Sequence, residues 1–395
     1  MKIKFLITAA MMFAAVMLSA QNRFSNSQKK INDDFQKFKQ AQQAGFDTYA
    51  KNITDEYDKY VEKINKEYQS FVKFIESQWG KGNATMSDKK SWVEYSDDKK
   101  SRTTVDFESG KAEVEVVLSD SELANPSIVK EKLEESVEQL LSSKGKTVEY
   151  NSDYIPKKPL SDDVIMKNLV DTKKYSNQTA SKEIAKAIVE NESVKITKVA
   201  NEHGNVNIVT ITPDMVGDYI YKLAKRYEPM VIAASKRFSI DRSLIFAIIE
   251  TESSFNPAAA SHIPAYGLMQ IVPKYAGRDA YKYLYGQDKL LNQTYLYQPD
   301  KNIEMGVGYL NLLETRYFKT VKDKQSRELC MIAAYNTGAG NVSRAMAGHT
   351  NVFKTIPQIN SMNYNQLYNH FRYKLPFDET RKYIQKVTSK REKYQ

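Results

Sequence analysis

Aromatic and aliphatic positions recur every eleven residues along the first part of the chain. The repeat comprises Phe24, Phe35, Phe46, Tyr57, Tyr68 and Trp79, a second series at Phe38, Tyr49, Tyr60 and Phe71, and Ile31, Ile53, Ile64 and Ile75. This period gives about 3.67 residues per turn, close to a straight α-helix. It predicts an amphipathic helical segment over residues 21–80, as one long helix or as two that break near Gly45. The stripe either packs on the next domain or a partner helix, or binds a glycan or lipid.

Residues 81–213 change to the polar–apolar alternation that is typical of half-buried strands. The predicted strands are 91–95, 103–107, 112–118, 194–199 and 206–211, with turns at 108–111 and 201–204. Helical patterns lie between them at about 127–142 and 162–190. We therefore predict an α+β accessory domain. Because none of its motifs carries chemistry, we expect it to have a positioning or recognition role.

Residues 214–395 keep a helical period of apolar positions almost to the end of the chain. Glycine, proline and asparagine mark the breaks between segments. The predicted helices are 214–237, 241–254, 265–286 with an interruption at Pro273, 300–318, 324–336, 338–347 and 378–391. This part of the chain should form an all-α domain.

The composition is that of a soluble globular protein, since 27% of the residues are charged and 41% are hydrophobic. It excludes a membrane protein with many spans. The formal net charge of +10 favours an anionic partner, such as nucleic acid, a membrane surface or an acidic cell-wall polymer. Because the basic residues are dispersed among acidic ones in a chain that we expect to be exported, we predict no nucleic-acid binding.

The expected export rests on the first twenty residues, which have the pattern of a cleaved secretory signal peptide. Lys2 and Lys4 precede an uncharged apolar run over 5–18, which ends in the small residues Ser19 and Ala20. The run is short for a transmembrane helix, although an uncleaved anchor is the alternative. We therefore expect a periplasmic protein, and peripheral association with the outer membrane or the cell wall stays open.

Cysteine and histidine give no sign of a metal site. Cys330 is the single cysteine, so no intrachain disulfide can form. The four histidines have no ligand-like spacing: His203, His262, His349 and His370. We predict neither a metal nor a cofactor.

Two glutamates, Glu250 and Glu252, stand near the end of the helix predicted over 241–254. With Asp241 as the N-cap and 100° per residue, Glu252 falls within the apolar stripe, and Glu250 falls on the opposite face. The stripe is formed by Leu244, Ile245, Ile248 and Ile249. We expect Glu250 to be a solvated charge. Burial should raise the pKa of Glu252, as a general acid requires. Periodicity alone leaves open a buried structural carboxylate, satisfied by helix caps or an arginine.

Downstream motifs extend this hypothesis. The motifs Glu252-Ser253, Gly267-Leu268-Met269-Gln270, Ala334-Tyr335-Asn336, and Glu379-Thr380 with Tyr383 occur in order, together with the connecting residues Phe255-Asn256-Pro257, Ser261, Pro299-Asp300 and Asn302. In order and spacing they resemble the soluble-lytic-transglycosylase domain, a goose-lysozyme-like helical fold, over about 215–391. The whole chain is similar to the C type of the membrane-bound lytic murein transglycosylases. That type is usually anchored through a cysteine just after the signal, whereas Gln21 stands there in this chain.

The resemblance implies that Glu252 protonates the oxygen that links N-acetylmuramic acid to N-acetylglucosamine in peptidoglycan strands. As a carboxylate it then takes the proton of the muramic acid 6-hydroxyl, which attacks C1 and closes a 1,6-anhydro ring. The residues carried over as substrate-binding are Ser261, Gly267, Met269, Gln270, Tyr335, Asn336 and Tyr383. The alternatives are a goose-type lysozyme that uses water and a non-catalytic cell-wall-binding scaffold. The sequence does not determine the oligomeric state.

Overall fold

The computed structural model describes residues 54–145, 160–161, 163–261 and 264–395. The predicted signal peptide and the aromatic repeat before residue 54 lie outside these residues. Contacts divide the chain into two units, residues 1–60 and residues 61–395. In the part of the chain that the structure describes, none of the helices combines the length and the apolar character that crossing a bilayer requires. We call residues 81–213 the mixed region and residues 214–395 the helical region, with the domain boundaries that the sequence predicts.

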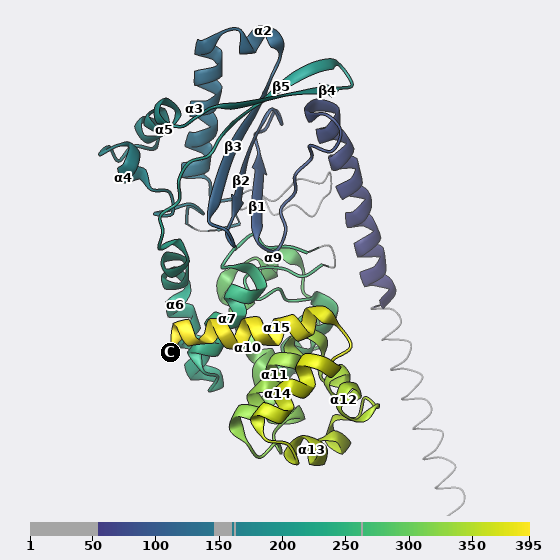
Figure 1. Cartoon of the computed structure of the whole chain (residues 1–395). Helices are drawn as coiled ribbons and strands as arrows, with labels where there is room; N and C mark the ends of the chain where they lie inside the picture. Colours follow the sequence, from purple (N-terminus) through teal and green to yellow (C-terminus); the bar gives the residue numbers. More distant parts are fainter. Residues whose placement is uncertain (1–53, 146–159, 162, 262–263) are drawn as a thin grey trace, which may run out of the picture. The chain divides into compact units, whose positions relative to one another are not determined.

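The mixed region contains a five-stranded antiparallel sheet in the order β1-β2-β3-β5-β4 (Figure 1). Its strands are β1 (Ser91–Tyr95), β2 (Ser101–Asp106), β3 (Lys111–Leu118), β4 (Lys195–Asn201) and β5 (Gly204–Ile211). The central pairing of β3 with β5 joins residues that are about 95 positions apart, for example Val114 opposite Ile211. Each predicted strand is present within about two residues, because the alternation that buries one face also fixes the register.

The helices of the mixed region are α2 (Asp120–Leu123), α3 (Pro126–Ser142), α4 (Thr172–Tyr175) and α5 (Ser181–Asn191). One face of this sheet is packed by α3, which contacts β2 and β3, while α5 packs on α3 and α4 packs on α5. The α3 helix begins at a strong signal, since the Asn125 side chain accepts from the Ser127 amide and Pro126 occupies the first turn. The helical pattern predicted over 162–190 is confirmed only for α4 and α5 and is wrong for the residues before them. Val170 bridges to Met215 and the Asp171 amide donates to Asp214, so the backbone leaves the helix there.

The other face of the sheet is covered by the end of the N-terminal helix, described over residues 54–79. Ile75 and Trp79 are fully buried against Val93 and Tyr95. The Trp79 indole also donates to the Lys99 carbonyl at 2.7 Å. These last residues of the aromatic repeat therefore pack on the next domain, which is one of the two roles expected for the stripe.

The helical region is all-α, as predicted, apart from isolated bridges. Its helices are α6 (Tyr219–Phe238), α7 (Arg242–Ser253), α8 (Arg278–Tyr285), α9 (Gln293–Leu296), α10 (Pro299–Leu312), α11 (Lys324–Thr337), α12 (Ala339–Ala347), α13 (Val352–Asn360), α14 (Tyr364–Lys374) and α15 (Asp378–Arg391), with short turns η1 (Pro273–Gly277), η2 (Leu313–Tyr317) and η3 (Glu392–Tyr394). The α7 helix lies at the centre, packed by α6, α15 and η3 (Figure 1). Every residue from Ser243 to Ser253 is buried.

Two helix predictions in this region are wrong, and two helices were missed. Residues 214 and 215 are held by bridges to Lys111 and Val170, so α6 begins later than predicted. Residues 265–272 form a tight turn instead of a helix, because Tyr266 and Ile271 exchange two backbone hydrogen bonds of 3.1 Å. The helices α13 and α14 were not predicted. Asparagine often marks a break between helices, but Asn351 and Asn363 are N-caps at which these two helices begin.

Candidate active site

The α7 helix carries Glu252 into the interior of the molecule. The Asp241 carboxylate accepts from the Ser243 amide at 2.7 Å, as expected of the predicted N-cap. The helix ends at Ser254, whose left-handed φ of 49° stops it. Glu252 therefore lies in the last turn, and only 8% of its surface is exposed.

Glu250 is a buried structural carboxylate, so the prediction of a solvated charge is wrong. Only 4% of its surface is exposed. One carboxylate oxygen accepts from the Lys393 ammonium at 3.0 Å and the other from the Tyr394 hydroxyl at 2.7 Å, while Lys390 lies 3.4 Å away. Burial favours the neutral form, but Tyr394 and the two lysines outweigh it and hold the pKa of Glu250 below its ordinary value. Helical phase placed Glu250 on the second face of α7 but could not show that the end of the chain covers that face.

Glu252 has the opposite environment. Burial raises the pKa of Glu252 to about 7, although Lys89, Tyr383 and Lys90 favour the charged form; Glu379 raises the pKa further. No described residue donates a hydrogen bond of standard geometry to its carboxylate. Near neutral pH the group is therefore protonated in a substantial fraction of molecules and can give and retake a proton.

A turn with the motif Gly267-Leu268-Met269-Gln270 is fixed to the end of α7. The Ser253 hydroxyl donates to the Leu268 carbonyl at 2.8 Å. Gly267 has a φ of +73°, and an added Cβ would lie 2.5 Å from the Asn302 amide nitrogen and from the Leu296 carbonyl oxygen. Glycine is therefore required here by backbone conformation and by packing against α10. The Asn302 side chain completes the turn by accepting from the Met269 amide at 2.7 Å.

Met269 and Gln270 have different positions in this turn. The Met269 side chain is fully buried and packs against Gly306 of α10, which gives it a supporting position. Gln270 has a left-handed φ of 47°, and its amide nitrogen donates to the Gly267 carbonyl at 3.1 Å. Its Oε1 atom is buried and has no hydrogen-bond partner among the described residues. Such an acceptor is available to a ligand with hydroxyl or amide donors.

Two tyrosines from α11 and α15 lie close enough to Glu252 to interact with its charge. Burial and the Glu252 carboxylate raise the pKa of Tyr335 and the pKa of Tyr383 well above the ordinary value. The Tyr335 hydroxyl donates to the Met269 carbonyl at 2.8 Å. The Tyr383 hydroxyl is buried, and it forms no hydrogen bond of standard geometry with any described residue.

The remaining predicted residues lie at the edges of this group. Asn336, half-buried on α11, accepts from the Thr380 hydroxyl at 2.6 Å, which joins α11 to α15. Ser261 is half-buried and adjoins residues 262–263, outside the described residues. The structure thus brings together Glu252, the 267–270 turn, Tyr335, Asn336 and Tyr383.

Two functional candidates were missed by sequence reasoning, and both come from the mixed region. Lys89 lies 3.5 Å from Glu379, at the start of α15. Lys90 reaches the last turn of α7, next to Glu252. Two lysines before a strand form no motif, so no local signal could have found either contact.

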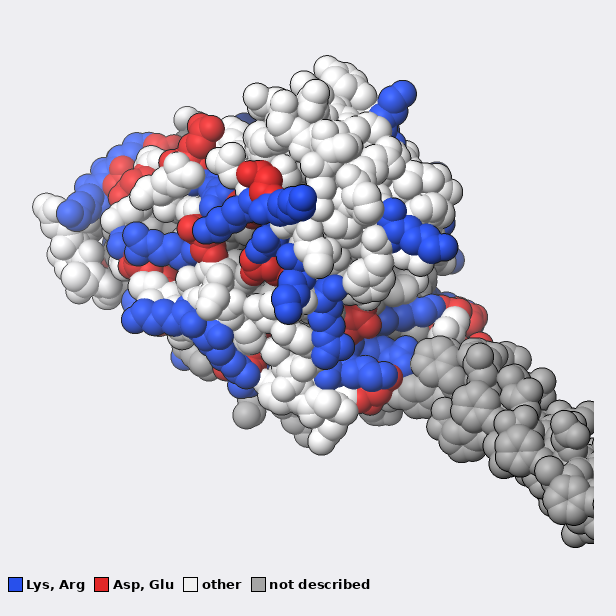
Figure 2. All heavy atoms as spheres, turned by 90° about the horizontal axis from the view of Figure 1, so that it is seen from below, with Lys and Arg blue, Asp and Glu red and all other residues white. Residues whose placement is uncertain are grey.

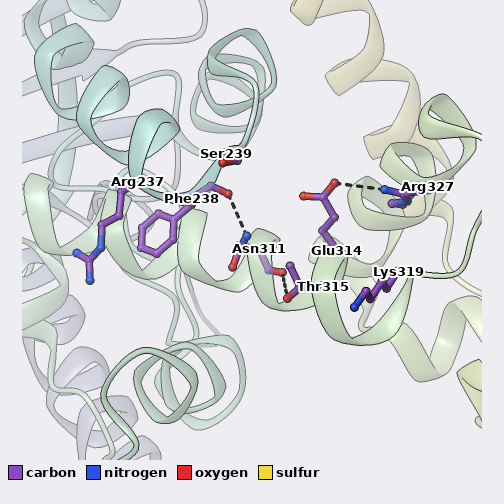
Figure 3. Close-up of a pocket in the computed structure, with 8 residues that line it drawn as sticks. All are labelled: Arg237, Phe238, Ser239, Asn311, Glu314, Thr315, Lys319 and Arg327. Atoms are coloured by element: carbon purple, nitrogen blue, oxygen red, sulfur yellow. Dashed lines mark hydrogen bonds and ion pairs between the residues drawn. The ribbon is translucent and has the colours of Figure 1, made fainter.

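A separate hollow of about 430 Å³ contains none of the predicted site residues (Figure 3). It is lined by Arg237, Phe238, Ser239, Asn311, Glu314, Thr315, Lys319 and Arg327. Two of its three cations are paired, since Arg237 binds Glu304 and Arg327 lies 3.8 Å from Glu314. On the face drawn in Figure 2, lysines and arginines are interspersed with acidic residues and form no continuous basic field.

The chain is similar in sequence to known proteins along most of its length. Residues 57–219 match the family "Membrane-bound lytic murein transglycosylase C, N-terminal domain", and residues 229–355 match "Transglycosylase SLT domain". A membrane-bound lytic murein transglycosylase C from Pectobacterium atrosepticum is 30% identical over 326 residues, 81% of this chain and 87% of the relative. Its counterpart from Sodalis glossinidius is 32% identical and also covers 81% of this chain and 87% of the relative. A solved structure of an inactive mutant of lytic transglycosylase Slt from Pseudomonas aeruginosa aligns with 45% of this chain and 25% of that longer chain, at 26% identity and a TM-score of 0.34.

Proposed function

Because the chain belongs to the membrane-bound lytic murein transglycosylase C family, we propose that it cleaves the glycan strands of peptidoglycan with Glu252 as its acid and base. As a member of this family, the chain is an enzyme. The bond assigned to it joins N-acetylmuramic acid to N-acetylglucosamine, and the product carries a 1,6-anhydro ring. The observation that carries the assignment is the buried Glu252, whose carboxylate no described cation pairs and whose pKa burial raises to about 7.

In the first step the protonated Glu252 gives its proton to the glycosidic oxygen as the bond to C1 breaks. A general acid is most effective when its pKa lies near the working pH, which a value of about 7 satisfies. The burial that raises this pKa also keeps water from the carboxyl group. Glu250 does not fit this role, because its oxygens are engaged by Lys393 and Tyr394.

In the second step the Glu252 carboxylate accepts the proton of the muramic acid 6-hydroxyl, which forms a bond to C1 and closes the ring. One carboxylate is sufficient, because the nucleophile belongs to the substrate, and an intramolecular attack of good geometry has an effective molarity of about 10⁵ M or more. Lys89 and Lys90 stabilise the carboxylate that exists between the two steps.

The surrounding residues are assigned roles by their positions. We assign substrate contact to Ser261, to Gln270 with its free Oε1, and to Asn336. We assign to Tyr383, whose buried hydroxyl interacts with Glu252, the orientation of Glu252 or of the reacting 6-hydroxyl. Gly267, Met269 and Tyr335 support this set through the packing and hydrogen bonds of the turn.

The second candidate function is hydrolysis of the goose-lysozyme type, and the observation that favours it is the presence of Glu379 near Glu252. Its charge is among those that raise the pKa of Glu252, so a second carboxylate lies within electrostatic range. Glu379 is exposed, and its carboxylate is engaged by the Lys89 ammonium at 3.5 Å. We therefore favour the substrate's own hydroxyl as nucleophile.

For location, we propose an exported enzyme of the cell envelope, consistent with the signal-like residues 1–20 and with the family name of its relatives. Digestion of purified peptidoglycan sacculi by the wild type and by Glu252→Gln tests the assignment of the acid. The wild type should clear the sacculi, and the variant, with its fold intact, should not. Clearing by a folded Glu252→Gln would assign the chemistry to another residue.

A further inference from the structure

The mixed region contributes one side chain to the last turn of α7. The Lys90 ammonium donates to the Glu250 carbonyl at 2.9 Å, to the Thr251 carbonyl at 2.7 Å and to the Ser254 hydroxyl at 3.1 Å. An ammonium has three N–H donors, and all three are used. The acceptors precede and follow Glu252, so Lys90 binds the turn that carries the proposed acid.

These acceptors are groups that a helix end leaves in need of partners. The last carbonyls of an α-helix lack some of their intrahelical donors, and the C-terminal end carries a partial negative charge. Lys390 also donates to the Glu250 carbonyl, at 3.0 Å, so a second cation from α15 reaches the same end. The carbonyls of the last turn of α7 therefore accept from one cation of α15 and from one cation of the mixed region.

The backbone that carries Lys90 is itself fixed. The Asp88 carboxylate accepts from the amides of Lys90 and Ser91, each at 2.7 Å, which sets the direction in which Lys90 leaves the chain. The same segment docks beyond α7: the Asn256 side chain donates to the Ser91 carbonyl at 3.3 Å, and the Ala260 amide donates to the Asp88 carbonyl at 3.4 Å. Residues 88–91 thus contact both the end of α7 and the loop that leads to Ser261.

We propose that Lys90 is a positioning residue for Glu252, so that the mixed region completes the catalytic site by holding the last turn of α7. This inference rests on the proposed function of Glu252. It gives the mixed region a definite role in catalysis, because the acid's turn would lose three hydrogen bonds and a neighbouring positive charge without this lysine.

The electrostatic surroundings agree with the geometry. Burial, with Lys390 and Lys386, lowers the pKa of Lys90 to about 8, while Glu108 and Glu252 act in the opposite direction. Lys90 is therefore charged at neutral pH and favours the carboxylate form of Glu252. Removing its charge should raise the pKa of Glu252.

The test compares four variants of the full chain on a soluble peptidoglycan glycan of at least four sugars. Lys90→Met removes the charge and the donors, Lys90→Gln retains an amide donor, and Lys90→Arg retains both the charge and donors. The control is Lys195→Met, an exposed lysine of the same region on β4. For each variant kcat and KM are measured separately, and the pKa of the Glu252 carboxyl is followed by ¹³C NMR, with its signal assigned by its loss in Glu252→Gln.

We expect Lys90→Met to lower kcat roughly tenfold with little change in KM, because a displaced acid affects the chemical step more than binding. The NMR titration should show a higher pKa for Glu252, Lys90→Arg should recover most of kcat, and Lys195→Met should match the wild type. If Lys90→Met does not fold, Lys90→Gln should give the same pattern. Unchanged kcat and unchanged pKa would overturn the proposal, as would a loss of activity that only follows the folded fraction, or a lower pKa, which would indicate water entry.

The NMR measurement separates this proposal from the proposed function. If Glu252→Gln retains full activity, the catalytic assignment fails, yet the response of the Glu252 pKa to Lys90→Met still decides whether Lys90 controls that carboxyl.

Discussion

The Tyr394 hydroxyl donates a hydrogen bond of 2.7 Å to the Glu250 carboxylate, which ties the end of the chain to the central helix α7. The ring of Tyr394 also stacks on Phe246 of α7, with 5.1 Å between ring centroids. Glu250 is thus an anchor for the last residues of the chain and stands two positions before the proposed acid. One helix carries a charged structural carboxylate and the proposed acid, whose pKa burial raises to about 7.

Glu250→Gln should destabilise the fold, because Lys393 and Lys390 lose their charged partner in a buried site. We expect a loss of about 2 kcal/mol in the free energy of unfolding, the usual size for a hydrogen bond to a charged group. Since the folded pKa of Glu250 is lowered, its stabilising effect is present above the ordinary pKa and is lost as the pH falls through the folded value. Urea unfolding at pH 7 and pH 3 measures the free energy of unfolding of this variant and of a control, Glu131→Gln, which changes an exposed residue of α3. Equal stability of the two variants at pH 7 would contradict the anchor.

Glu252→Gln should have the opposite effect on stability. A carboxyl whose folded pKa is about 7 and whose ordinary pKa is 4.5 stabilises the fold fully only below the ordinary value. Stability is lost as the pH rises, by roughly 3 kcal/mol once the pH exceeds the folded pKa. The variant should therefore unfold at higher urea concentration than the wild type at pH 8 and at a similar one at pH 4. A variant that is less stable than the wild type at pH 8 would show that Glu252 is not a desolvated carboxyl.

The pH dependence of turnover should respond to neighbouring charges with a predictable sign. Turnover should fall as the pH rises through about 7, where Glu252 loses its proton. Lys89→Met removes a positive charge and should move this fall to higher pH, while Glu379→Gln removes a negative charge and should move it to lower pH. Lys195→Met should leave the profile unchanged. Identical shifts in the Lys89 and Glu379 variants would exclude Glu252 as the group that titrates.

Tyr383 and Tyr335 form a matched pair of hydroxyl deletions. Tyr383→Phe removes a buried hydroxyl without a standard hydrogen bond to any described residue, so the fold should lose no stability. Turnover should fall roughly tenfold, and the alkaline fall in activity should move to higher pH, because Tyr383 favours the charged form of Glu252. Tyr335→Phe leaves the Met269 carbonyl without its donor and should cost about 1 kcal/mol in unfolding free energy. Unchanged turnover in the Tyr383→Phe variant would show that the Tyr383 hydroxyl has no role in catalysis.

The local pattern of apolar and polar residues predicted the structure correctly where a single helix or strand, with its own cap, determines it. The alternation over residues 112–118 and 206–211 predicted strands that pair in the sheet. Asp241 and the helical phase predicted that Glu252 lies on a buried face. Both inferences need only a few neighbouring residues and the period of the element.

Contacts between distant segments could not be predicted in this way. The partners of Glu250 are residues 390–394, about 140 positions away, and Lys90 reaches α7 from a position 160 residues earlier. The helix predicted at 265–286 failed because two backbone bonds between Tyr266 and Ile271 close a turn there. In each case a tertiary contact overrides the local pattern, and a single sequence does not record such contacts.

The central claim is that Glu252 is the only carboxylate that takes part in the reaction, with the substrate's 6-hydroxyl as nucleophile. Mass spectrometry of the products released from sacculi tests it most directly, with the wild type and Glu379→Gln digested in parallel. We predict muramic acid ends that lack one water, the mass of the 1,6-anhydro ring, from both proteins. Reducing muramic acid ends that carry the added water, and their disappearance in Glu379→Gln, would contradict the account and establish a hydrolase with two carboxylates.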